Sequence, residues 1–167
     1  NISGSYEAFT ISSWVKVDDY GDANTGFILD VGRNEDSKRI NLGVNANGFK
    51  AEIGGVSANV FDVYAPSSNT SNWLHVVLSW SGTDFARIYI NGNLAGETTS
   101  ITSGTLILEP GDSFNIGTRF SGGSSFQGNI DEVAIWNIAL TQEEIQSYMK
   151  TLPTGNESNL LGYWNFE

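Results

Sequence analysis

A chain of 167 residues is long enough to bury one complete core, and its formal net charge of −11 disfavours nucleic acid and anionic membranes as partners. It has no cysteine, which excludes disulfides and thiolate zinc sites, and no apolar run long enough to cross a bilayer. Nineteen glycines and an aromatic content of 12% are typical of an all-β domain with many turns.

The first clear element is a strand over residues 9–17. Apolar side chains such as Phe9 and Ile11 alternate with a second face that holds Trp14 among Thr, Ser and Lys. Asn47-Gly48 and Asn91-Gly92 are typical of hairpin turns. Further strands or hairpins are predicted at 26–32, 39–45, 49–55, 57–65, 73–80, 87–97, 105–111, 113–119 and 160–167.

The last long strand is expected over residues 130–137. Strict alternation places Asp131 on the same face as Val133 and Ile135, and Glu132 on the opposite face. Asp131 therefore points toward an apolar layer, where an unpaired carboxylate costs several kcal/mol or takes up a proton.

The one convincing helix follows this strand. Thr141 and Glu144 have the spacing of a capping box, and the helical pattern ends near Met149. About a dozen short strands and one helix, without internal repeats, predict a β-sandwich. Because the chain begins at Asn1 without an initiator methionine and ends in mid-pattern at Glu167, we expect residues 1–167 to be a single module cut from a longer protein.

The sequence contains few groups suited to catalysis. His75 is the one histidine and lies in the most apolar strand, so we expect a packed, hydrogen-bonded core residue rather than part of a Ser-His-Asp triad. Asp131 and Glu132, as neighbours in a strand, should face opposite sides of the sheet and cannot flank one sugar. An enzyme is therefore not expected.

Two acidic loops and a few aromatic or cationic residues are the candidates for binding. Oxygen ligands suited to calcium concentrate at residues 18–24 and 34–36, although a solvated acidic turn is the preferred interpretation of either loop alone. Exposed aromatic rings could stack on sugars and scarce arginines could hydrogen-bond to them. The candidate ligand-binding residues are Tyr20, Asp22, Asn24, Arg33, Asn34, Tyr64, Arg119 and Phe120.

Five segments in order resemble the laminin-G-like, pentraxin-related branch of the concanavalin A-like jelly rolls. They are FTISSWVKV, WLHVVLSW, RIYINGNLAGE, FNIG and FQGNIDEVAIWNIALTQEEI. Where members usually carry an earlier strand ending in an Asp-Tyr-Val-like motif, this chain has NISGSYEA. The resemblance implies an all-β, concanavalin A-like (laminin G-like) jelly-roll sandwich of two antiparallel sheets, one concave, with one short helix near the C-terminus.

Family members bind glycans, proteins or lipid headgroups, frequently with calcium, at the concave face or the loop rim. The resemblance thus implies a calcium ion at Asp131, for which Asp18 and Asp36 are further candidate ligands. The alternative is that Asp131 accepts backbone amides from the adjoining turn without a metal. Glucanases of this fold typically carry Glu-x-Asp-x-x-Glu on one strand face, and no such run exists here.

Three functions follow from these observations, in order of preference. The first is a calcium-stabilised, non-catalytic carbohydrate-binding module of a secreted or surface bacterial protein, which would tether attached domains of the same chain to a polysaccharide. The second is a protein-binding or spacer module of a bacterial adhesin. The third is a glucanase. Neither nucleic-acid binding nor membrane insertion is expected.

Overall fold

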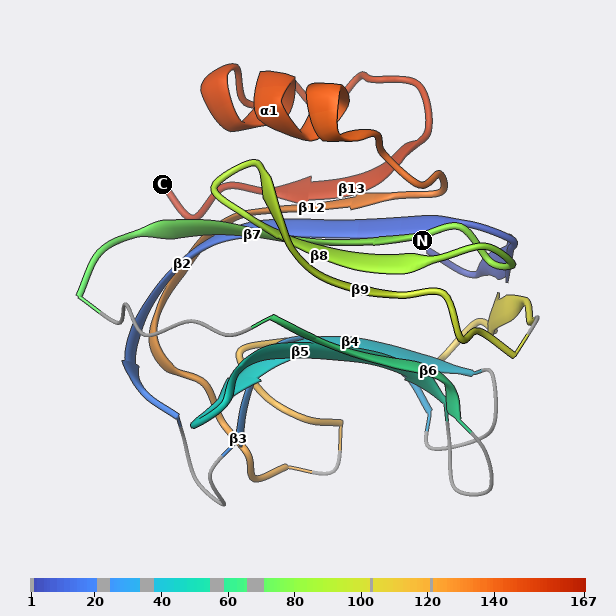
Figure 1. The fold of residues 1–167 in the computed structure, drawn as a ribbon, viewed down its shortest axis with the longest axis horizontal. Coiled ribbons are helices and arrows are strands. Elements are labelled where there is room, and N and C mark those ends of the chain that lie inside the picture. Colours follow the sequence, from blue (N-terminus) through green and yellow to red (C-terminus); the bar gives the residue numbers. More distant parts are fainter. Residues whose placement is uncertain are drawn as a thin grey trace.

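The protein is a sandwich with a helix laid on one side, so that it has three layers (Figure 1). The computed structural model describes residues 2–20, 25–33, 38–54, 59–65, 71–102, 104–120 and 122–167, apart from the side chains of residues 59–62. Their elements are β1 (Gly4–Tyr6), β2 (Phe9–Asp19), β3 (Thr25–Gly32), β4 (Arg39–Asn45), β5 (Gly48–Gly54), β6 (Asn59–Ala65), β7 (Leu74–Trp80), β8 (Ala86–Ile90), β9 (Asn93–Thr98), β10 (Leu106–Leu108), β11 (Ser113–Ile116), β12 (Gln127–Trp136), α1 (Gln142–Lys150) and β13 (Leu160–Trp164).

Two large antiparallel sheets form the sandwich. One has six strands in the order β13-β12-β2-β7-β8-β9, and the other has five in the order β11-β3-β4-β5-β6. A small third sheet pairs β1 with β10. The predicted all-β, concanavalin A-like sandwich with a short helix near the C-terminus is thereby confirmed. The expected strand over 105–111 is shorter, because Pro110 lies in a turn closed by the Asp112 amide and the Glu109 carbonyl.

The main core lies between the two large sheets and follows the predicted alternation. Its fully buried members come from every long strand of the sandwich, and burying each large side chain contributes about 1.5–3 kcal/mol. They include Phe9, Ile11, Leu29, Ile40, Leu42, Phe49, Ile53, Leu78, Trp80, Ile88, Val133 and Ile135.

A second apolar cluster lies on the outer face of the six-stranded sheet, under α1. It joins Val77, Tyr89 and Trp136 of the sheet to Leu140 and Ile145 around the helix start. The predicted capping box is present: the Thr141 hydroxyl accepts a hydrogen bond from the Glu144 amide, and a Glu144 carboxylate oxygen accepts one from the Thr141 amide at 2.8 Å. Within the described part of the chain, no helix is long and apolar enough to span a membrane.

The C-terminal segment completes the six-stranded sheet, as predicted. β13 pairs with β12 in antiparallel register, from Trp136 opposite Leu160 to Val133 opposite Trp164. The Trp164 ring also stacks on Phe114 of the five-stranded sheet, with ring centroids 4.7 Å apart. The tail therefore belongs to this sandwich.

A bulge in β12 changes the phase of the strand between Asp131 and Ala134. Asp131 lies opposite Trp14 and Ala134 lies opposite Ser12, so that three steps along β12 match two along β2. The extra residue, Glu132, has the left-handed φ of 53°. The predicted alternation is wrong here. Val133 faces the main core, whereas the bulge turns Asp131 and Glu132 together toward the helix side of the sheet.

Candidate functional site

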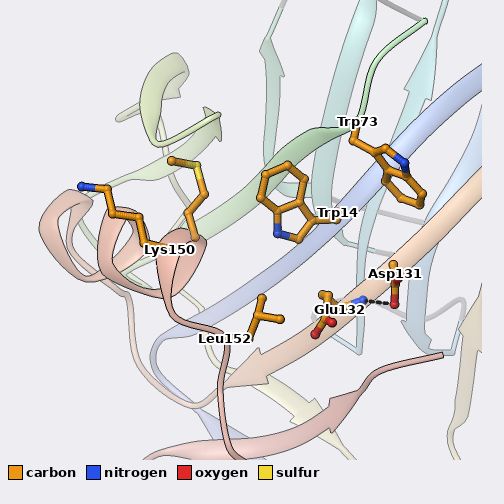
Figure 2. A pocket seen from close by; sticks show the side chains of 7 residues that line it. Trp14, Trp73, Asp131, Glu132, Lys150 and Leu152 are labelled. Atoms are coloured by element: carbon orange, nitrogen blue, oxygen red, sulfur yellow. Dashed lines mark hydrogen bonds between the residues drawn. The ribbon is translucent and has the colours of Figure 1, made fainter. Parts of the chain in front are cut away.

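A pocket of about 440 Å³ opens on the helix side of the six-stranded sheet, beside the C-terminal end of α1. We call it the tryptophan pocket. Figure 2 shows Trp14 at its centre, with Trp73 and two carboxylates on one side and Leu152 and the end of α1 on the other. Its lining residues are Trp14, Trp73, Asp131, Glu132, Met149, Lys150 and Leu152.

The two indoles are held differently. Trp14 projects from the middle of β2 and is half-buried, with its ring 5.3 Å from the ring of His75 on the neighbouring strand. Trp73 immediately precedes β7 and is 43% exposed. One aromatic wall is therefore fixed by the sheet, and the other is open to solvent. Large exposed aromatic surface next to a concave pocket is typical of a ligand site.

One oxygen of each carboxylate is held by hydrogen bonds. Oδ1 of Asp131 accepts hydrogen bonds from the backbone amides of Glu132 at 2.8 Å and Phe166 at 3.3 Å. Oε2 of Glu132 accepts a hydrogen bond from the Tyr163 hydroxyl. The second oxygens, Oδ2 of Asp131 and Oε1 of Glu132, accept no hydrogen bond from the described residues. The pocket thus presents two carboxylate oxygens for a ligand.

Several negative charges act on the Tyr163 hydroxyl beside these carboxylates. The pKa of Tyr163 is raised by burial, by its hydrogen bond to Glu132, and by the negative charges of Glu132, Asp131 and Glu167. Between the described residues, neither pocket carboxylate forms an ion pair with a lysine or arginine. Lys150 lies at the opposite side of the pocket from both carboxylates (Figure 2).

His75 supports Trp14 from the sheet. It is 4% exposed, and burial lowers the pKa of its imidazole to about 4, so the ring is neutral at pH 7. The predicted packing is confirmed, but the predicted hydrogen bonding fails at Nδ1, which has no partner among the described residues. The neutral, buried ring packs against the Trp14 indole in the way expected of a core residue.

The loop residues predicted to bind a ligand are only partly brought together. Arg33 and Phe120 line a second cavity of about 330 Å³ near the end of β3, and the Arg119 guanidinium lies 5.5 Å from the Phe120 ring. Arg33 is already neutralised there by Asp112 at 2.7 Å and Glu109 at 2.8 Å. This ion-paired arginine is less available to a ligand than its position in the sequence indicated.

The remaining candidates lie elsewhere or cannot be placed. Tyr20 packs partly buried against the main core, and Tyr64 is half-exposed on β6, an edge strand of the five-stranded sheet. The four loop residues Asp22, Asn24, Asn34 and Asp36 lie outside the described residues.

The calcium site was expected at Asp131 because this residue was predicted to point into an apolar layer, and the structure places it differently. Asp131 is not in the apolar layer, and its Oδ1 accepts two backbone amides, which is the arrangement of the metal-free alternative. Asp18 is exposed, four residues along β2 from the partner of Asp131. Among the residues that the structure describes, no three acidic or histidine side chains are grouped so that they could hold a metal ion. The described residues thus contain no cluster of three such ligands, and the calcium site stays a prediction.

A buried ion pair lies under the outer surface of the five-stranded sheet. Asp30 is fully buried, and its carboxylate accepts hydrogen bonds from Arg39 Nε at 2.7 Å and from the Phe120 amide at 2.8 Å. The Arg39 guanidinium lies within 5.5 Å of the ring centroids of Phe27 and Phe120. The Arg39 guanidinium is therefore already engaged by Asp30 and the two rings, and these contacts hold the loop after β11 to the sheet.

The tryptophan pocket was not predicted from the sequence. The signal available was Trp14, a large aromatic residue on the otherwise polar face of an alternating strand. No comparable signal marked the other apolar residues of the pocket, because their local sequence does not show that they contact Trp14. These residues are Trp73, Met149 and Leu152. Asp131 was assigned to the wrong face of the sheet because the bulge at Glu132 has no glycine to mark it.

The fold agrees with a comparison against known families. A family model described as the concanavalin A-like lectin/glucanases superfamily matches residues 3–146. The chain belongs to this superfamily. The predicted laminin-G-like, pentraxin-related resemblance is confirmed by it and by the relatives below.

Relatives of this superfamily domain include much longer proteins. The sushi, von Willebrand factor type A, EGF and pentraxin domain-containing protein 1 of Rattus norvegicus is 25% identical over 167 residues, which cover 95% of this chain and 4% of the relative. The chain therefore spans a small fraction of the length of that protein.

Two solved structures share the architecture of the domain. A proposed carbohydrate-binding protein from Bacteroides ovatus has a TM-score of 0.73 at 20% identity, over 99% of this chain and 47% of the other. A heptameric SAP-like pentraxin from Limulus polyphemus has a TM-score of 0.69 at 19% identity, over 98% and 81%. At these identities the likeness shows the fold alone.

Proposed function

We propose that this domain is a non-catalytic carbohydrate-binding module of a secreted or cell-surface protein, and that the glycan binds in the tryptophan pocket. The observation that carries the proposal is the meeting of two indoles and two partly free carboxylates in one open pocket. Membership of a lectin/glucanase superfamily and a structural neighbour proposed to bind carbohydrate support it.

The pocket contains partners for both the apolar face and the hydroxyl groups of a sugar ring. The apolar C–H face of a pyranose packs on an indole, and Trp14 and Trp73 supply two such surfaces. The ring hydroxyls donate hydrogen bonds, and those to carboxylate oxygens are strengthened by charge. A volume of about 440 Å³ is in the usual range for small-ligand sites.

The arrangement of the carboxylates favours binding over hydrolysis. Glycosidases need two carboxyl groups that flank the scissile bond. Asp131 and Glu132 line the same pocket, contrary to the prediction from alternation, but they come from consecutive positions of one strand and approach a sugar from one side. A turnover assay with soluble β-glucans tests this directly, and release of reducing ends would overturn the non-catalytic assignment.

Calcium stabilisation stays a prediction from the family resemblance. The predicted ligands are Asp131, Asp18 and Asp36, of which Asp36 lies outside the described residues. Thermal melting with calcium and with a chelator tests the prediction. If neither calcium nor the chelator changes the melting temperature, the prediction of calcium stabilisation is wrong.

A glycan array, run with and without calcium, tests the proposed function. We expect Trp73→Ala to lower affinity for the identified glycan at least tenfold, about 1.4 kcal/mol, without changing the melting temperature. Tyr64→Ala is the matched control, because Tyr64 is similarly exposed, at 50%, but lies on the other sheet. If the domain binds none of the plant, algal and host glycans on the array, the proposal is rejected. If Tyr64→Ala loses binding and Trp73→Ala does not, the glycan binds at the five-stranded sheet instead.

A protein-binding or spacer module of a bacterial adhesin is the second candidate. The relative in Rattus norvegicus favours this candidate. The region similar to this chain is 4% of that protein, and its name includes several other modules. The neighbouring domains of the full-length protein discriminate between the two. A hydrolase beside this domain supports glycan targeting, whereas tandem copies support adhesion.

A further inference from the structure

We propose that the tryptophan pocket selects a glycan that carries a protonated amine, such as an oligosaccharide of unacetylated amino sugars. This inference rests on the proposed function and names the ligand class of the same site. It follows from the juxtaposition of Trp14 and Trp73 with the carboxylates of Asp131 and Glu132, which have no cationic partner among the described residues.

Asp131 and Glu132 have no cationic partner among the described residues although both are half-buried, whereas most other described carboxylates without an ion pair are exposed. Five of the eight lysine and arginine residues form ion pairs elsewhere, and their acidic partners include Asp30, Glu52, Glu97, Glu109 and Asp112. The other three cations form no ion pair with Asp131 or Glu132 in the described part of the chain. These two carboxylates are therefore neighbours in sequence and in space, half-buried and uncompensated.

The nearest lysines do not replace a ligand cation. Lys150 lines the pocket but is exposed, and Figure 2 shows its ammonium group at the opposite side from both carboxylates. Lys16 is two residues beyond Trp14 on β2 and does not line the pocket. A cationic group of the ligand can therefore take a position that the protein leaves open.

An ammonium group of the ligand can interact favourably with both the carboxylates and the indoles of the pocket. A neutral sugar can donate hydrogen bonds to Asp131 and Glu132, but it displaces water from two adjacent negative charges without compensating them. An ammonium can donate a hydrogen bond to Oδ2 of Asp131 and one to Oε1 of Glu132, and it is also attracted to the face of an indole. The net charge of −11 adds a long-range attraction for a polycationic glycan.

The backbone supports a functional role for Glu132. A left-handed φ of 53° is uncommon for a residue with a long side chain, and strain of this kind persists where the surrounding structure fixes it, commonly at binding sites. Without the extra residue in β12, Asp131 and Glu132 would face opposite sides of the sheet. The strained residue is thus the one that brings the second carboxylate into the pocket.

The test compares two ligands that differ only in N-acetylation: β-1,4-linked glucosamine oligosaccharides and N-acetylglucosamine oligosaccharides of the same length. We expect the wild-type domain to bind the amine form at least tenfold more tightly by calorimetry at a pH where the amine is charged. The ratio of the two affinities should fall with added salt and approach one when the amine is deprotonated.

Two matched variants assign the preference to the pocket. Glu132→Gln should reduce the affinity ratio severalfold. Glu143→Gln changes the net charge by the same amount at an exposed position outside this pocket and should leave the ratio unchanged. An equal fall in both variants, or a wild-type ratio near one with binding still dependent on Trp73, would overturn the amine preference and leave the proposed function standing. Binding of neither oligosaccharide, with tight binding of a cationic peptide instead, would overturn both.

Discussion

Burial of the imidazole of His75 makes the stability of the domain depend on pH in a defined window. In the folded state the pKa is about 4, against 6.5 for an exposed histidine, and burial is the cause. As pH falls below 6.5, the unfolded chain takes up a proton that the folded protein does not, so the free energy of unfolding decreases. The full difference corresponds to about 3.4 kcal/mol, of which about 2.5 kcal/mol is lost between pH 7 and pH 4.5.

Urea denaturation followed by tryptophan fluorescence, at steps from pH 7 to pH 4.5, measures this loss. The control is His75→Leu, which keeps an apolar side chain of similar size but cannot titrate. Carboxyl groups whose pKa is lowered in the fold, such as those of Glu52 and Asp112, begin to lose their stabilisation only at the acidic end of this range, and the control subtracts their effect. Because the chain has one histidine, its NMR titration is unambiguous, and a midpoint near 6.5 in the folded protein would refute the reasoning.

Three further perturbations test other parts of the structure. Arg39→Met should cost about 3–5 kcal/mol in urea denaturation because it leaves Asp30 charged and buried, and adding Asp30→Leu should recover most of the loss; a mild single-variant effect would contradict the burial. Thr141→Ala should cost about 1 kcal/mol through the lost helix cap, whereas Thr141→Ser should be nearly neutral. A chain ending at Gly155 lacks β13 and should be insoluble or melt well below the full chain; equal melting would show that the tail is dispensable.

Much of the fold could be predicted from the sequence because its signals are local. Alternation identified β2 and the hairpin turns identified the paired strands. The spacing of Thr141 and Glu144 gave the helix start, and both cap hydrogen bonds are present. Each of these features depends on residues only a few positions apart, so one sequence contains the whole signal.

The β12 bulge could not be predicted in the same way. Strict alternation assumes that every residue advances the strand by one step, and Glu132 breaks that rule without the glycine that usually marks a left-handed position. The error at one residue assigned Asp131 to the wrong face, and the expected calcium site depended on that assignment. A second limit is distance along the chain: Trp14 and Met149 meet only after the sandwich has formed.

The six-stranded sheet is the middle of three layers, and this position has a consequence for the thermodynamics of binding. The main core holds the sheet from below and the helix-side cluster holds it from above, so the floor of the pocket is pre-organised before a ligand arrives. Asp131 and Glu132 are already oriented by hydrogen bonds, and Trp14 by its contact with His75. Only exposed groups such as Trp73 and Lys150 lose rotamer freedom on binding. Ligands should therefore associate without backbone rearrangement and differ mainly in their dissociation rates.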